Sequence, residues 1–101
     1  RDFIYIDDLM HAVETIVEKA MFTGQPINIA SGKQTTIKNA ALSFLKTYKP
    51  DVALEFNNAQ KKGDPANWEA SIDKLASLGY QSKTNFETGI KNTALWMRDQ
   101  N

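Results

Sequence analysis

The residues best suited to chemistry lie in one short stretch, Lys-Lys-Gly-Asp-Pro-Ala-Asn-Trp, at positions 61–68. Its two lysines carry positive charge that suits phosphate, and the glycine after them lets the backbone come close to a ligand. The proline that follows Asp64 favours an extended backbone there and so restricts where the carboxylate points. Trp68 adds a flat apolar surface. Composition alone leaves two interpretations open: a ligand-binding loop, or a solvated loop whose tryptophan fills the core.

The sequence lacks the usual catalytic constellations. It has no glycine-rich phosphate loop after a strand, no Tyr-x-x-x-Lys on a helix, no serine elbow and no His-Glu-x-x-His. Asp7 and Asp8 are adjacent at a helix start and cannot face each other, so we interpret them as helix caps. We expect the one histidine, His11, to be solvated or at an interface. We therefore predict no catalytic residue and no metal or cofactor site in this sequence.

Composition and charge exclude several classes of protein. The 101 residues suffice for one domain with a modest core, and 42% apolar with 24% charged residues is ordinary for a globular domain. Twelve basic and twelve acidic side chains balance, so no global field favours nucleic acid or anionic lipid. Without cysteine, disulfides and thiolate sites are excluded. We find no membrane-crossing apolar run and no signal peptide, and predict a cytoplasmic protein without nucleic-acid or membrane partners.

Hydrophobic periodicity predicts about four helices and two or three short strands. The helices are expected to begin near residues 9, 36, 71 and 84, and the strands to cover residues 3–6, 26–30 and 52–56. Thr35 or Thr36 is expected to cap the second helix, and Thr84 with Glu87 fits a capping box for the last. This order of elements predicts a small mixed α/β (α+β) unit rather than a helical bundle.

Five short segments, in order and at matching spacing, carry a family resemblance. They are Arg1-Asp-Phe-Ile-Tyr-Ile-Asp-Asp-Leu9, Ile27-Asn-Ile-Ala-Ser-Gly32, Lys62-Gly-Asp-Pro65, Gly89 and Trp96. Together they resemble the C-terminal, substrate-binding part of extended short-chain dehydrogenases/reductases, the group that holds nucleotide-sugar epimerases and dehydratases. The resemblance implies that residues 1–101 form a single partial domain. The Rossmann cofactor domain, with its catalytic tyrosine and lysine, would then precede Arg1.

The same resemblance implies substrate-binding roles for three residues of the first half. In the family, the arginine at the position of Arg1 meets the diphosphate, which suits its planar fork of donors. Phe3 stands where relatives place an aromatic residue near the nucleotide. Ile37, at the start of the second predicted helix, corresponds to a residue that lines the base pocket.

Three further residues belong to the loop described first. Relatives carry Arg-x-Gly-Asp there, whereas this sequence reads Lys61-Lys-Gly-Asp64. Lysine keeps the charge but loses two-pronged recognition, and Asp64 is expected near the ribose or diphosphate. Trp68 stands where some epimerases have a tyrosine. We expect Arg1, Lys61 and Asp64 to converge, with Trp68 or Ile37 on the apolar wall.

The resemblance implies a role as the substrate-binding portion of an NAD(P)-dependent nucleotide-sugar epimerase or dehydratase. The chain would position the sugar for hydride transfer to NAD or NADP, which the missing half would hold. By itself it would bind no cofactor and be inactive. Its expected partners are the nucleotide-sugar substrate, the Rossmann domain and, through exposed helix faces, other copies of itself. The alternative is a non-catalytic ligand- or partner-binding module of the same superfamily. A helix-turn-helix DNA binder fits the balanced charge poorly.

Overall fold

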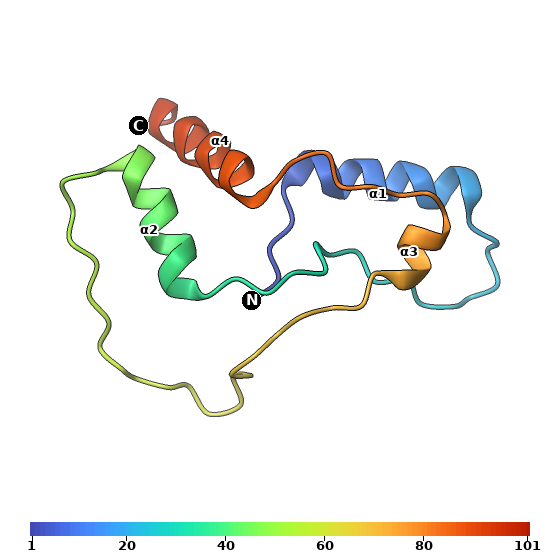
Figure 1. Cartoon of the computed structure of the whole chain (residues 1–101), viewed down its shortest axis with the longest axis horizontal. Helices are drawn as coiled ribbons and strands as arrows, with labels where there is room; N and C mark the ends of the chain where they lie inside the picture. The colour runs from blue at the N-terminus through green and yellow to red at the C-terminus, as the bar shows by residue number, and fades with distance from the viewer.

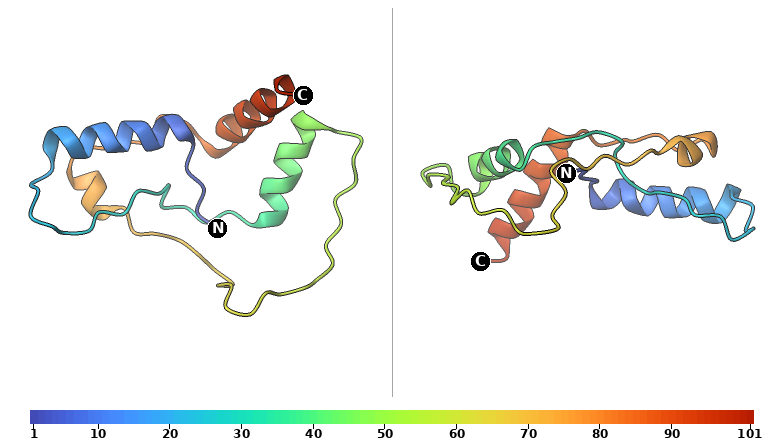
Figure 2. Two further views of the ribbon diagram at one scale, coloured as in Figure 1. Left: turned by 180° about the vertical axis from the view of Figure 1, so that it is seen from behind. Right: turned by 90° about the horizontal axis from the view of Figure 1, so that it is seen from below.

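The computed structural model describes all residues from Arg1 to Asn101, and Figure 1 shows four helices joined by long irregular segments. They are α1 (Ile6–Lys19), α2 (Ile37–Tyr48), α3 (Asp73–Ser77) and α4 (Phe86–Asp99). Helices α2 and α4 pack together at one end, α1 and α3 lie at the other, and the N-terminus lies between the two ends (Figure 1). The molecule is flat, with extents of 48 × 35 × 19 Å, as the edge-on view in Figure 2 shows.

The predicted α/β class is wrong, because the chain contains no β-sheet and is a small helical unit. Only one isolated antiparallel bridge forms, between Asp2 and Gln34. The first predicted strand, at residues 3–6, does not form, because α1 already begins at Ile6. The other two, at residues 26–30 and 52–56, lack a partner strand, and no backbone–backbone hydrogen bond involves residues 26–30 or 53–56. Alternation indicates an extended, half-buried segment, but a sheet also needs a second strand beside it.

The helix caps agree with the sequence in one case and differ in two. Thr36 caps α2 by accepting a hydrogen bond from the Asn39 N–H at 3.1 Å, as predicted. The residue before α4 is Asn85, whose side chain accepts from the Thr88 N–H at 2.8 Å, so the capping box at Thr84 is wrong by one residue. Helix α1 begins after Tyr5 without a side-chain cap, and the interpretation of its two aspartates as caps is also wrong.

The core is small and lies between α1, α3 and the extended segment at residues 26–30. Ala12, Leu75 and Tyr80 are buried at its centre, with four partly buried isoleucines packed around them: Ile16, Ile27, Ile29 and Ile72. Much apolar surface remains outside this core. On α1, for example, Val13 and Val17 are both exposed. None of the four helices has the length and apolar character to cross a membrane.

Leu75 is the largest fully buried side chain, so Leu75→Ala tests whether this core stabilises the chain. We expect the free energy of unfolding to fall by about 2–4 kcal/mol, because the substitution removes buried methyl groups and leaves a cavity. Leu42→Ala, on α2 and 47% exposed, is the matched control and should cost less than about 1 kcal/mol. Urea unfolding followed by circular dichroism measures both. Equal losses in the two variants would contradict this description of the core.

Candidate functional site

The carboxylate of Asp2 anchors the N-terminal segment to two distant parts of the chain. It accepts hydrogen bonds from the Ser31 N–H at 2.7 Å, the Ser31 hydroxyl at 2.6 Å, the Gly32 N–H at 3.0 Å and the Ala70 N–H at 3.2 Å. Burial opposes ionisation of this group, but the donors from Ser31, Ala70 and Gly32 outweigh it and lower the pKa of Asp2. Asp2 is therefore a negatively charged tie that fixes its neighbour Arg1 beside the segment leading to Ala70.

Arg1 contacts the loop at residues 61–68 in three ways. Its Nη1 donates a hydrogen bond to the Pro65 carbonyl at 2.8 Å, and its Nη2 lies 3.6 Å from Asp64 Oδ1. The guanidinium carbon lies 5.9 Å from the centre of the Trp68 ring, within the range of a cation–π contact. The structure thus brings together Arg1, Asp64 and Trp68, although more than sixty residues separate the first from the others.

Asp64 lies at the end of a tight turn at residues 61–64. The Asp64 N–H donates to the Lys61 carbonyl at 3.1 Å, and Gly63 between them has φ +91°, a conformation that glycine adopts without strain. Lys61 thus shares the turn with Asp64, but its exposed side chain makes no hydrogen bond or ion pair, with Arg1 or any other residue. The turn leaves one negative and two positive side chains of the loop open to solvent.

Two other predicted site residues lie apart from the Arg1 contacts. The Phe3 ring packs against Phe86 at the start of α4, with 6.0 Å between ring centres. Ile37 is the first residue of α2 and is about half exposed. Neither makes an interaction with Arg1, Asp64 or Trp68 that the structure records. Their proposed nucleotide-binding roles stay predictions, as do those of the other four residues.

Asp8 is a second anchoring carboxylate, and the sequence interpretation missed both. It is 2% exposed and accepts from the Ser82 hydroxyl at 2.9 Å, the Lys83 N–H at 3.0 Å and the Thr84 N–H at 3.1 Å. Burial opposes its ionisation, yet these donors, with a smaller effect from His11, lower the pKa of Asp8. Asp8 therefore accepts from residues 82–84 and does not cap the N–H groups of its own helix. The available signal was weak: an aspartate in each of two short polar clusters far along the chain from its donors.

Tyr80 and His11 lie beside this second carboxylate. The two rings are 5.5 Å apart, and the Tyr80 hydroxyl is buried without a hydrogen-bond partner. Burial and the negative charge of Asp8 raise the pKa of Tyr80, while Ser82 opposes the rise. The phenol is therefore neutral at physiological pH and acts as part of the core. No set of three or more histidine or acidic side chains lies close enough to hold a metal ion.

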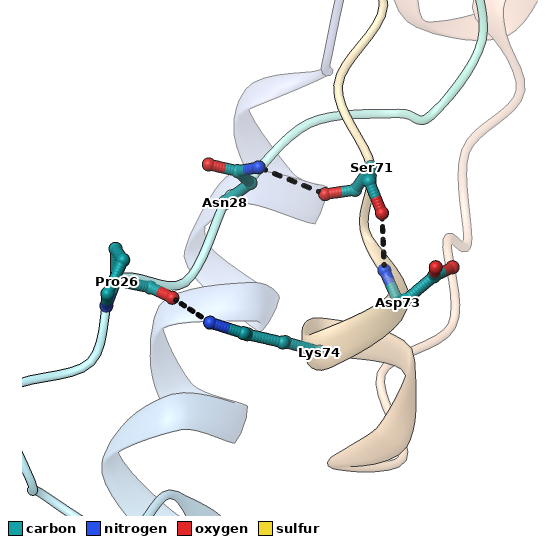
Figure 3. A pocket seen from close by; sticks show the side chains of 5 residues that line it. All are labelled: Pro26, Asn28, Ser71, Asp73 and Lys74. Carbon is teal, nitrogen blue, oxygen red and sulfur yellow. Dashed lines mark hydrogen bonds between the residues drawn. The ribbon is translucent and has the colours of Figure 1, made fainter.

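Two shallow hollows lie away from Arg1. One, of about 360 Å³, is drawn in Figure 3 and is lined by Pro26, Asn28, Ser71, Asp73 and Lys74. Its polar groups already pair with one another: the Lys74 ammonium donates to the Pro26 carbonyl and the Asn28 amide to the Ser71 carbonyl, each at 3.2 Å (Figure 3). The other, of about 430 Å³, is lined mainly by charged side chains at the start of α1 and by Lys83 and Thr84. Neither contains a predicted site residue.

Known proteins similar to this chain act on nucleotide sugars. Over 98 residues it is 26% identical to the Arabidopsis thaliana trifunctional UDP-glucose 4,6-dehydratase/UDP-4-keto-6-deoxy-D-glucose 3,5-epimerase/UDP-4-keto-L-rhamnose-reductase RHM2. Over 97 residues it is 29% identical to GDP-L-fucose synthase 1 of the same plant. Each alignment covers 95% of this chain but 14% and 29% of the respective relative, so the chain spans less than a third of their length.

No family model matches the chain, and no solved structure matches it either. The similarity to these enzymes nevertheless extends along nearly the whole chain. It supports a relationship with epimerases, dehydratases and reductases of the short-chain dehydrogenase/reductase type.

The lowered pKa of Asp8 predicts how stability depends on pH. A carboxylate with a native pKa below its ordinary value of 3.8 stabilises the fold fully above that value, and the stabilisation is lost as pH falls through the native pKa. Asp8→Asn should remove this acid-sensitive part and destabilise the chain at pH 7 by about 1–3 kcal/mol, because the amide keeps only one acceptor oxygen and turns an NH2 group toward donors that the second oxygen had accepted from. Urea unfolding between pH 2 and pH 7 measures both effects.

Asp7→Asn is the matched control, because Asp7 is the exposed neighbour of Asp8 on the same helix. It should leave stability at pH 7 within about 0.5 kcal/mol of the unsubstituted chain and keep the acid-sensitive part. Identical pH profiles for the two variants would show that Asp8 does not have the role assigned to it.

Proposed function

We propose that this chain is the substrate-binding portion of an NAD(P)-dependent nucleotide-sugar epimerase or dehydratase. In this role it holds the nucleoside diphosphate, and the sugar faces a nicotinamide bound by another part of the enzyme. Catalysis would then depend on positioning, because binding the diphosphate fixes the sugar carbon relative to the hydride acceptor. The relationship to enzymes whose names include UDP-sugar and GDP-sugar chemistry supports this class of substrate.

The observation that carries the proposal is the contact of Arg1 with Asp64, Pro65 and Trp68. A guanidinium presents donors in a planar fork that matches two phosphate oxygens. The side chains of Lys61 and Lys62 are exposed in the same loop and free to add positive charge. Trp68 is half exposed and offers a face against which a base or sugar can stack.

The residues of this chain do not fit a dinucleotide cofactor. A nicotinamide dinucleotide is held at a glycine-rich turn between a strand of a parallel sheet and a helix. Here the glycines outside the helices lie in separate turns and no sheet is present. We therefore assign NAD or NADP to a part of the enzyme outside residues 1–101.

The apolar side of α1 is our proposed contact surface for that cofactor-binding part. Its exposed side chains recur at helical spacing, and they are Ile6, Met10, Val13 and Val17. An apolar row of this kind on a helix normally packs against another element. The same surface would also support the alternative role of a non-catalytic, partner-binding module of the superfamily.

Binding of UDP or GDP tests the proposal. We expect Arg1→Gln to weaken binding roughly 10- to 100-fold, because it removes charge-assisted hydrogen bonds to the diphosphate. Arg98→Gln, in the last turn of α4, removes the same charge elsewhere and should bind like the unsubstituted chain. Isothermal titration calorimetry measures the dissociation constants. No detectable binding by the unsubstituted chain, or equal affinity of the two variants, would contradict the proposed role of Arg1.

An activity assay of the chain alone tests whether catalysis needs the cofactor-binding part of the enzyme. Incubated with NAD or NADP and a panel of UDP- and GDP-sugars, it should produce no epimerised, dehydrated or reduced product. The reason is that the tyrosine–lysine pair and the cofactor-binding turn of such enzymes are not among its residues. Product formation that scales with the concentration of purified chain would overturn this assignment.

A further inference from the structure

Every recorded interaction of the Arg1 side chain is with the loop at residues 61–68. The guanidinium donates to the Pro65 carbonyl, lies next to the Asp64 carboxylate and sits over the Trp68 ring. The side chain of Arg1 is only 33% exposed. A diphosphate that approached this guanidinium would therefore meet groups that already contact it, and one of these groups is itself an anion.

The two polar contacts of Arg1 differ in how readily they exchange. The hydrogen bond to the Pro65 carbonyl is 2.8 Å long, and its acceptor is neutral backbone. The distance to Asp64 Oδ1 is 3.6 Å, longer than a charge-assisted hydrogen bond, and the Asp64 side chain is 59% exposed. Ion pairs of this exposed kind contribute little to stability. Asp64 can thus leave Arg1 at small cost, whereas the Pro65 contact can stay and keep the guanidinium in place.

We infer that Asp64 competes with the ligand: its carboxylate occupies the face of the Arg1 guanidinium that a diphosphate would bind, and the diphosphate must displace it. The inference rests on the proposed function and adds a device that sets its affinity. A carboxylate and a phosphate group each offer two negatively charged oxygens on one central atom, so both suit the same fork of donors. A diphosphate carries more negative charge than a carboxylate and therefore wins the exchange.

Displacement also releases Asp64 toward solvent on a turn that Gly63 allows to form. The side chains of Lys61 and Lys62 would then face the ligand, and the Asp64 carboxylate would no longer lie beside Arg1. As a competitor, Asp64 changes the affinity for the ligand in the opposite direction from a residue that simply binds it. If Asp64 only contributed contacts to the ligand, its removal would weaken binding; as a competitor, its removal strengthens binding.

Inorganic pyrophosphate separates these two roles, because it has the diphosphate but no ribose or base. Asp64→Asn should bind pyrophosphate roughly two- to fivefold more tightly than the unsubstituted chain, the range that loss of a weak, exposed ion pair to Arg1 predicts. Calorimetry at fixed ionic strength measures the affinity. Glu69→Gln is the matched control, since it removes one exposed negative charge next to Trp68 without an interaction with Arg1, and its affinity should stay within twofold.

A double variant shows whether the gain passes through Arg1. In a chain that already carries Arg1→Gln, adding Asp64→Asn should give no gain in affinity. The double variant should bind pyrophosphate as weakly as Arg1→Gln alone. Unchanged or weaker pyrophosphate binding by Asp64→Asn, or an equal gain in Glu69→Gln, would overturn the inference even if the unsubstituted chain binds UDP as proposed. If neither the unsubstituted chain nor Asp64→Asn binds UDP or pyrophosphate, the proposed function and the inference both fail.

Discussion

The structure depends most on one partly buried carboxylate near the start of the chain, that of Asp2. Asp2 accepts four hydrogen bonds from groups at residues 31, 32 and 70, and so ties three segments that are far apart in sequence. With no sheet and few buried residues, the N-terminal segment is held by this carboxylate and by the two backbone hydrogen bonds between Arg1 and Thr35, each 2.8 Å long. These contacts together place Arg1 against the loop that contains Asp64 and Trp68, because Thr35 holds the backbone of Arg1 and Asp2 ties the next residue to Ala70.

The geometry around Asp2 explains why Gly32 is a glycine. Its φ is +72°, and a Cβ added there would lie 3.1 Å from the Ile72 side chain. Only glycine adopts this backbone conformation readily and leaves room for Ile72, so the Gly32 N–H can reach the carboxylate. Asp8 does a similar task in the first turn of α1, where it holds the segment that enters α4. Hydrogen-bonded carboxylates thus take over part of the work that a larger apolar core would do.

Local patterns predicted the local parts of this structure. Helical spacing indicated the four helices, and a threonine before an apolar run indicated the Thr36 cap. The strands failed because alternation at residues 52–56 describes an extended segment and cannot show whether a partner strand exists. The anchoring role of Asp2 and Asp8 was missed for a related reason. Their donors lie 29 to 76 residues away, and no local rule connects residues at such separations.

The candidate site was predictable only in part. The loop at residues 61–68 was identified from its own composition, and the family resemblance paired it with Arg1. The sequence could not show that Pro65 contributes a backbone carbonyl, or that Asp64 faces the guanidinium itself. Both facts depend on the turn at Gly63 and on the Asp2 tie, which are features of the folded chain.

An NMR titration of the chain between pH 2 and pH 7 tests the central claim most directly. The side-chain carboxyl carbon of Asp2 should titrate below the ordinary value of 3.8, and the amide protons of Ser31, Gly32 and Ala70 should shift with the same midpoint. Such a common transition would show that one carboxylate holds all three segments. A midpoint at or above 3.8 for Asp2, or amide shifts that do not follow it, would contradict the account.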